Sequence, residues 1–177
     1  MRLKKLLRFL KNYRVFSLNK GNPLVKGITS NSKEVKAGFI FVAIRGSKFD
    51  GNDFIAEAIK NKAVAVVSEN KPSLKEFIWI KVQDTHKALG ILLNKFYGDP
   101  SRRLKVVGIT GTNGKTTLSY ILEKIIIANK RKCGVIGTIN YRFENKIFPA
   151  LNTTPSPERL IGLLNEMAKE NLDYVVM

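Results

Sequence analysis

The stretch that most restricts how this chain can fold is residues 105–117, with the sequence K-V-V-G-I-T-G-T-N-G-K-T-T. Its first part is rich in β-branched residues, which favour a buried strand. Glycines at positions 108, 111 and 114 then allow the backbone to turn back sharply. Residues 118–128 are mostly apolar and predict a helix. A strand, a glycine-rich turn and a helix in this order are typical of an α/β unit with a parallel sheet.

The turn in this stretch has the chemistry of a phosphate-binding loop. Its backbone N–H groups and the positive end of the following helix attract an anion. Lys115 can reach the outer phosphates of a nucleotide, and the Thr116 hydroxyl can bind Mg²⁺. The general P-loop pattern requires a glycine where this chain has Ile109, and Gly108 stands one residue too early. A plain strand-to-helix connector is therefore the alternative to a nucleotide site.

Cysteine and histidine are too scarce for several kinds of site. Cys133 is the only cysteine, which excludes an intramolecular disulfide and suits a reducing compartment. A metal site built from Cys and His is excluded as well. A Ser-His-Asp triad would have to use His86, the only histidine, and no G-x-S-x-G pattern accompanies it. We expect His86 on the surface of a helix.

The net charge of +17 raises the possibility of a basic nucleic-acid-binding module, which is the non-enzyme alternative. The basic residues are scattered along the chain, however, and no zinc-finger or RNA-recognition pattern accompanies them. A positive field also attracts small polyanionic substrates. We therefore expect no nucleic-acid partner.

The N-terminal residues 1–13 combine basic residues with leucines. Arg8 and Lys11 interrupt the apolar run, so the segment does not fit a signal peptide. Its leucines recur at helical spacing and predict a short amphipathic helix that packs on its own domain rather than on a membrane. No apolar run approaches the ~18 residues of a membrane span, and we expect no membrane partner.

The first part of the chain alternates strands and helices. Strands are predicted at 39–44, 63–67 and 77–82, with a helix from Asp53 to Lys62 that makes the first two strands parallel. Asp84 can cap another helix, which carries an apolar face up to Phe96. We place the domain boundary near Val82, which gives domains 1–82 and 83–177. A boundary at 98–103 is the alternative.

The second part continues the α/β pattern. It predicts a helix at 118–129, the strand Cys133–Ile136, and a hairpin or irregular excursion at 141–150. Ser156 or Thr154 can cap a helix that starts near Pro157. Residues 174–177 begin a further buried strand, and the chain looks cut within it.

Separated motifs carry a resemblance that covers nearly the whole chain. They are Asn31-Ser32-Lys33, Gly38, Phe41-Val42-Ala43, Gly46, Asp50-Gly51, Phe54-Ile55, Ala58, Ala65-Val66-Val67, the loop at 108–117, Gly137-Thr138-Ile139 and Asn152-Thr153-Thr154-Pro155. In this spacing they resemble the Mur ligases of peptidoglycan synthesis, and within that family the MurE type. The family's loop, G-x-x-G-T-N-G-K-T-T, accounts for the shifted glycine. Asn31 and Lys33 depart from the usual Asp and Arg.

The resemblance implies a fold and an activity. The fold is α/β, with a small N-terminal UDP-sugar-binding domain and the start of a P-loop, Rossmann-like ATPase domain with a parallel sheet, here truncated. The activity is an ATP-dependent amide ligase that adds diaminopimelate or L-lysine to UDP-N-acetylmuramoyl-L-alanyl-D-glutamate. The D-glutamate carboxylate becomes an acyl phosphate, which the incoming amine attacks. ATP and Mg²⁺ are the implied cofactors, and a cytoplasmic monomer is expected.

The resemblance also assigns residues. The implied ATP-binding residues are Gly111, Thr112, Asn113, Gly114, Lys115, Thr116 and Thr117, of which Lys115 is catalytic and Thr116 the metal ligand. The implied substrate residues are Ser32, Ser47, Lys48 and Phe49 for the UDP part and Asn152, Thr153 and Thr154 for the muramoyl-dipeptide. Taken singly, several of these are ordinary turn formers or helix caps.

In the family, the last strand continues into a Glu-Val-Ser-Ser segment that supplies a second metal ligand. We therefore expect residues 1–177 alone to bind weakly, if at all, and not to ligate. A MurF-type or folylpolyglutamate-type ligase of the same superfamily is the alternative enzyme.

Overall fold

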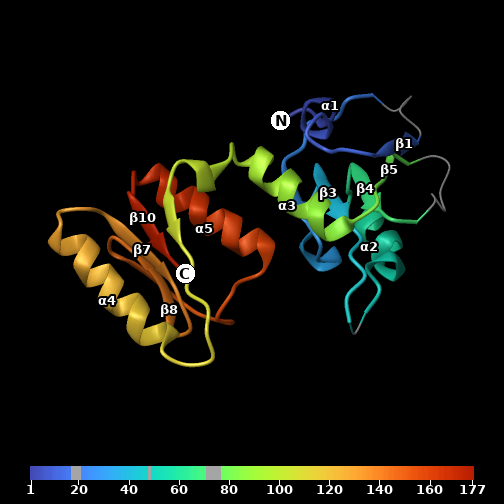
Figure 1. The fold of residues 1–177 in the computed structure, drawn as a ribbon. Coiled ribbons are helices and arrows are strands. Elements are labelled where there is room, and N and C mark those ends of the chain that lie inside the picture. Colours follow the sequence, from blue (N-terminus) through green and yellow to red (C-terminus); the bar gives the residue numbers. More distant parts are fainter. Residues whose placement is uncertain (17–20, 48, 71–76) are drawn as a thin grey trace. The chain divides into compact units, whose positions relative to one another are not determined.

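A computed structural model of the chain describes residues 1–16, 21–47, 49–70 and 77–177. The chain divides into two units, Met1–Phe96 and Tyr97–Met177, and each has a five-stranded sheet of its own (Figure 1). Parallel strand pairs connected through helices occur in both units. The predicted α/β fold class is confirmed.

The sheet of the first unit has the strand order β1-β5-β4-β3-β2. Strands β2 to β5 are parallel, and β1 is an antiparallel edge strand. The elements are α1 (Leu3–Leu7), β1 (Arg14–Phe16), β2 (Gly27–Thr29), η2 (Ser32–Glu34), β3 (Phe39–Val42), η3 (Gly51–Phe54), α2 (Ile55–Lys60), β4 (Ala65–Ser68), β5 (Trp79–Lys81) and α3 (Thr85–Phe96). The predicted parallel pairing of β3 with β4 is confirmed, with Ile40 opposite Ala65.

Aromatic and β-branched side chains from the centre of this sheet form a core with α2. Phe41, Val66 and Trp79 are almost completely buried and cluster with Ile55 and Ala58. Burying side chains of this size stabilises a fold by roughly 1.5–3 kcal/mol each. This core fixes the position of β3, and the loop that follows β3 carries several of the expected substrate residues.

The N-terminal helix α1 is held by its leucines. Leu3, Leu6 and Leu7 are buried, and α1 packs against α3. The prediction that this amphipathic segment packs on its own domain is confirmed. In the parts of the chain that the structure describes, no helix combines the length and the apolar character needed to cross a membrane.

The division between the units lies between Phe96 and Tyr97, whereas the sequence placed a boundary near Val82. The helix between these points, α3, begins as expected, with the Asp84 carboxylate accepting a hydrogen bond from the N–H of Lys87 at 2.8 Å. Its apolar face packs against β2 and α1 and therefore belongs to the first unit. Amphipathic spacing shows that a helix is buried, but not against which sheet.

The second unit has the strand order β6-β10-β7-β8-β9. Strands β6, β10 and β7 are parallel, and β8 and β9 form an antiparallel hairpin beside β7. The elements are η4 (Pro100–Arg102), β6 (Lys105–Val107), α4 (Lys115–Ala128), β7 (Cys133–Ile136), β8 (Asn140–Phe143), β9 (Lys146–Pro149), α5 (Pro157–Lys169) and β10 (Tyr174–Val176). The hairpin is one of the two possibilities that the sequence left open at 141–150.

The two long helices of the second unit cover opposite faces of its sheet (Figure 1). Val135 and Val176 face α4 and pack with Leu122 and Ile126. The next residue along β7, Gly134, faces α5, where a Cβ atom would lie 2.9 Å from Met167. Alternation of side chains along each strand thus gives the sheet one core per face.

Strands β1 and β2 were not expected from the sequence. Each is three residues long and too short for a recognisable alternation. Both are strands because they pair with β5 and β3, which are themselves buried.

Candidate functional site

The glycine-rich turn joins the carboxyl end of β6 to the amino end of α4. Gly114 is the residue before α4 and has a φ of 78°, a conformation that glycine adopts without steric strain. The helix begins at Lys115, so the first N–H groups of α4 have no carbonyl partner within the helix. The turn and helix end therefore have the geometry that favours binding of an anion.

Lys115 and Thr116 lie at the start of α4, with their side chains partly buried. The Lys115 ammonium group donates hydrogen bonds to the carbonyl oxygens of Gly111, at 2.5 Å, and Thr112, at 3.5 Å. Ser119 is buried one turn further, and its hydroxyl donates to the Thr116 carbonyl at 2.7 Å. The lysine thus lies folded over its own loop, within reach of any phosphate that the loop binds.

A cavity of about 240 Å³ opens beside this lysine. It is lined by Ile109, Thr110, Gly111, Lys115, Thr116, Ser119, Ile136, Gly137, Thr138, Thr153, Thr154 and Met177. The cavity therefore brings together residues from the phosphate-loop candidate and from the segment at 152–154. The two groups were expected to bind different substrates of one reaction, and both contribute to the lining of one cavity.

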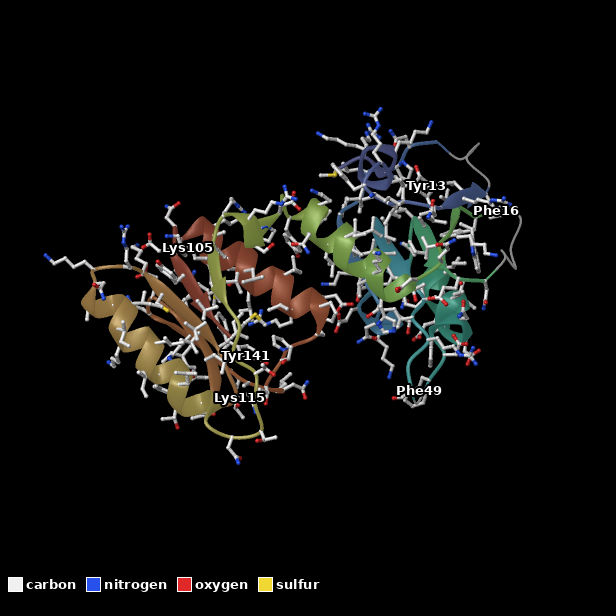
Figure 2. All side chains as sticks on the ribbon, viewed as in Figure 1. Tyr13, Phe16, Phe49, Lys105, Lys115 and Tyr141 are labelled. Atoms are coloured by element: carbon white, nitrogen blue, oxygen red, sulfur yellow. The ribbon has the colours of Figure 1, made fainter. Side chains whose placement is uncertain are left out.

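Other residues expected at this site lie outside the cavity lining. Thr112, Asn113, Gly114 and Thr117 are exposed on the loop and the first turn of α4. Asn152 is also exposed, and its carbonyl oxygen accepts a hydrogen bond from the buried Tyr141 hydroxyl at 2.6 Å. Figure 2 labels Lys115 and Tyr141 in this part of the second unit.

Thr116 is the candidate metal ligand, and its hydroxyl-bearing side chain lines the cavity. Mg²⁺ prefers oxygen ligands and usually keeps several waters and phosphate oxygens, so one protein hydroxyl fits its chemistry. No cluster of three or more His, Cys, Asp or Glu side chains suitable for a metal occurs among the described residues. The residues present therefore fit a metal that arrives with a nucleotide.

In the first unit, Ser32 follows β2 at the carboxyl edge of the parallel strands. Its side chain is buried and its hydroxyl donates to a Glu57 carboxylate oxygen at 2.5 Å. The Asn31 side chain accepts from the N–H of Lys33 at 3.1 Å and caps the short η2 helix. Asn31 therefore acts as a turn former here, whereas Ser32 is tied to α2.

Ser47 and Phe49 lie in the loop that follows β3, at the same edge of the sheet. Both are exposed, and the Gly46 N–H donates to the Phe49 carbonyl at 2.9 Å. Lys48, which was expected between them, lies outside the described residues. Asp50 ends the loop, and hydrogen bonds from the backbone and side chain of Asn52 lower the pKa of its carboxyl group.

The expected substrate residues of the first unit thus follow two neighbouring strands, β2 and β3, which pair in parallel. Ligands of open parallel sheets bind at the carboxyl ends of the strands. This placement agrees with a ligand site at that edge of the sheet, although the Ser32 hydroxyl proton is already donated to Glu57.

Several cavity residues were not assigned from the sequence. Gly137 and Thr138 follow β7 directly, and Met177 follows β10, so the rule that ligands bind at the carboxyl ends of parallel strands would have found them. Ser119, which lines the cavity, and Tyr141, which lies outside its lining, had no such signal. Their roles depend on contacts with Thr116 and Asn152 that appear only when the chain is folded.

Two protein-family models match the chain. The model described as Mur ligase family, catalytic domain, matches residues 24–97, and the model described as Mur ligase middle domain matches residues 109–177. Together they take in most of the chain.

Several curated proteins that are similar to this chain share one name. A UDP-N-acetylmuramoyl-L-alanyl-D-glutamate–2,6-diaminopimelate ligase of Aquifex aeolicus (strain VF5) is 54% identical over 131 residues, covering 74% of this chain and 27% of the relative. The ligase of that name from Oceanobacillus iheyensis is 37% identical over 179 residues, covering 100% of this chain and 36% of the relative. The chain thus spans about a third of the length of the relatives it matches.

Solved structures of ligases with related names have a fold similar to that of this chain. A structure titled as the UDP-N-acetylmuramoyl-L-alanyl-D-glutamate–2,6-diaminopimelate ligase matches with a TM-score of 0.78 at 22% identity, over 99% of this chain and 35% of that one. The MurF ligase from Thermotoga maritima in complex with ADP matches with a TM-score of 0.58 at 30% identity, over 86% of this chain and 31% of that one.

Proposed function

This chain belongs to the Mur ligase family, and we propose that its units are the UDP-sugar-binding and phosphate-loop parts of an ATP-dependent amide ligase. The reaction proposed is the addition of diaminopimelate to UDP-N-acetylmuramoyl-L-alanyl-D-glutamate, the reaction in the names of the curated relatives. The observation that supports it most is the cavity that Lys115 and Thr116 line together with Thr153 and Thr154. A site of this kind can hold a nucleotide and a carboxylate side by side.

In the proposed mechanism the second unit positions two anions and neutralises charge. The N–H groups of the loop and the Lys115 ammonium hold the ATP phosphates, and the Thr153 and Thr154 hydroxyls orient the D-glutamate carboxylate toward the γ-phosphate. Such transfers need little covalent chemistry from the protein, because positioning and charge neutralisation supply most of the rate. Lys115 must leave its contacts with Gly111 and Thr112 to reach the phosphates.

Mg²⁺, bound through the Thr116 hydroxyl and the nucleotide, would neutralise charge on the phosphates. The residues of this chain supply the remaining steps: they hold the nucleotide, aim the carboxylate and keep the two in contact. No enzyme nucleophile is required, since the acyl phosphate forms directly between the substrates. A cytoplasmic site of action is proposed with this function, because peptidoglycan precursors are made inside the cell.

In the first unit, the loops after β2 and β3 are proposed to bind the UDP moiety. Ser47 and Phe49 are exposed there, and Phe49 also packs edge-on against Phe54 with ring centroids 6.3 Å apart. An exposed aromatic ring can stack on a base. Ser32 is proposed to support the site through Glu57, unless UDP binding releases its hydroxyl.

Calorimetry with Mg·ADP tests the nucleotide part of the proposal. Lys115→Ala removes the ammonium group from the cavity and is expected to weaken Mg·ADP binding at least about tenfold, which corresponds to about 1.4 kcal/mol. The matched control is Lys124→Ala, which removes an exposed lysine from the middle of the same helix. The control is expected to bind Mg·ADP like the unaltered chain.

An equal loss of Mg·ADP affinity in Lys115→Ala and Lys124→Ala would contradict the proposal. It would show that Lys115 acts only through the general positive charge of the chain. Salt dependence of the affinity separates these cases, since screening weakens long-range attraction between exposed charges more than a direct contact. Unspecific duplex DNA binding that is insensitive to Lys115→Ala would favour the nucleic-acid alternative.

A MurF-type ligase is the second candidate, supported by the likeness to the Thermotoga maritima protein. Its substrate would be the UDP-tripeptide rather than the UDP-dipeptide. In the same calorimetric series the UDP-dipeptide is expected to bind more tightly than the UDP-tripeptide, and the opposite order would favour the second candidate.

A further inference from the structure

Strand β8 contacts the segment at 152–154 and helix α4, both of which contribute residues to the lining of the cavity in the second unit. Its neighbouring residues Tyr141 and Arg142 point to opposite faces of the sheet, as successive residues of a strand must. Tyr141 reaches the segment at 152–154, and Arg142 reaches α4. The two contacts come from adjacent positions of one backbone.

Tyr141 makes the contact with the segment at 152–154. Its side chain is 3% exposed, and its hydroxyl donates to the Asn152 carbonyl oxygen at 2.6 Å. Thr153 and Thr154, the next two residues, line the cavity. The Tyr141 hydroxyl thus connects β8 to the backbone directly before these two threonines.

Arg142 makes the contact with α4, at Glu123, which lies beyond the α4 residues that line the cavity. Its guanidinium group donates to the Glu123 carboxylate of α4, with Nε to Oε1 at 3.0 Å and Nη2 to Oε2 at 2.6 Å. The same group lies over the Tyr120 ring, 4.0 Å from its centroid. Both charged side chains are largely shielded from solvent, so this two-point contact is among the stronger kinds of ion pair.

The hairpin itself is fixed to the sheet. Residues of β8 pair with β7 on one side and β9 on the other, with Tyr141 opposite Ile136 and Phe148. Ile136 also lines the cavity. Strand β8 therefore cannot slide without breaking its hydrogen bonds to both neighbouring strands.

We propose that Tyr141 is a positioning residue, which holds Thr153 and Thr154 at the correct distance from the phosphate loop while Arg142 holds α4. This inference rests on the proposed function, because the spacing matters when a carboxylate must meet a phosphate. Phosphoryl transfer requires near-contact, aligned reactants, and small displacements lower the rate strongly. Tyr141 itself does not touch the reacting atoms.

Nitrogen-15 relaxation of the unliganded chain and of Tyr141→Phe tests the inference. The phenylalanine keeps the buried ring and deletes only the hydroxyl, so a role in packing alone predicts no change. We expect the order parameters of the Thr153 and Thr154 amides to fall from about 0.85 to below about 0.6, while those of α4 stay unchanged. Tyr174→Phe, which removes a hydroxyl that accepts from Lys105 in the same unit, is the matched control and should leave both threonines rigid.

A titration with Mg·ADP then links the contact to the site. In the unaltered chain we expect Mg·ADP to change the NMR chemical shifts of the amides at 111–117 and of Thr153 and Thr154. In Tyr141→Phe the shifts at 111–117 should remain, and those of the two threonines should fall by more than half. Full shifts of both threonines in Tyr141→Phe would overturn the positioning role.

The two hypotheses fail in different ways. Unchanged order parameters in Tyr141→Phe, or equal loosening in Tyr174→Phe, would overturn the role of Tyr141 whatever binds. Absence of any shift at 111–117 in the unaltered chain would instead overturn the proposed nucleotide site, and the order parameters would still decide whether Tyr141 holds the loop.

Discussion

At the scale of single residues, several side chains have a different role from the one that their type suggests. Ser32 was expected to contact a nucleotide, yet its hydroxyl is buried against Glu57. Asp50, part of a motif that resembles the family, forms a turn here, because its carboxylate accepts hydrogen bonds from Asn52. The identity of a residue restricts its chemistry, whereas its neighbours decide which part of that chemistry is used.

Cys133 shows the same dependence and leads to a pH prediction. Burial is the main cause that raises the pKa of its thiol to about 11, and the Glu123 carboxylate adds to the effect. The thiolate is the reactive form, so at pH 8 the native chain should react with iodoacetamide about 100-fold more slowly than the urea-unfolded chain. The rate should rise through pH 9 and 10 toward the raised pKa.

Mass spectrometry of the carbamidomethylated chain at timed intervals measures this rate. The unfolded chain at the same pH is the internal control, because its thiol has an ordinary pKa. Equal rates in the two states at pH 8 would show that Cys133 is accessible and ionises normally.

At the scale of elements, local signals located helix ends better than strands. Asp84 caps α3 as expected, and Ser156 rather than Thr154 caps α5, since its hydroxyl oxygen accepts from the Arg159 N–H at 3.3 Å. Strands β1 and β2 were not predicted, because a strand of three residues is too short to show a recognisable alternation of side chains. A cap is a contact within a few residues, whereas a strand needs a partner from elsewhere in the chain.

The capping assignment predicts a difference between two otherwise similar substitutions. Ser156→Ala should lower the free energy of unfolding by about 1 kcal/mol, because the first turn of α5 loses its acceptor. Thr154→Ala should change it by less than about 0.5 kcal/mol, since Thr154 is exposed and outside the helix. Urea titrations followed by circular dichroism measure both, and a larger effect of Thr154→Ala would reverse the assignment.

At the scale of the whole molecule, the chain consists of two units with separate sheets. The place of α3 decides where the first unit ends. Four of its apolar side chains, Ala88, Leu89, Leu92 and Leu93, are at most 3% exposed. A first domain that ended at Val82 would lose them all.

The division predicts different behaviour for two shortened chains. Residues 1–96 should fold alone and give a cooperative urea transition, because they keep the core of their sheet. Residues 1–82 should not, since each missing buried leucine removes roughly 1.5–3 kcal/mol, and total stabilities are typically 5–15 kcal/mol. A cooperative transition in residues 1–82 would place the boundary where the sequence suggested.

Much of the site was predictable because its chemistry is local. The glycine turn, Lys115 and Thr116 lie within a few residues of one another, and any chain with this order of residues tends to form a strand, a loop and a helix start. The motif at 152–154 was found through its resemblance to a family. Neither signal contains the distance between the two segments.

The sequence by itself determined the α/β class, the glycine-rich turn between a strand and a helix, and the family, because these depend on short patterns of glycine, charge and apolar spacing. Only the tertiary structure decided that α3 completes the first unit, that Thr153 and Thr154 line one cavity with Lys115, and that the Tyr141 hydroxyl donates to the Asn152 carbonyl oxygen. The physical reason is that these contacts follow from strand order and sheet pairing. Side-chain periodicity shows which face of an element is buried, but the partner that buries it is chosen by packing of the whole chain.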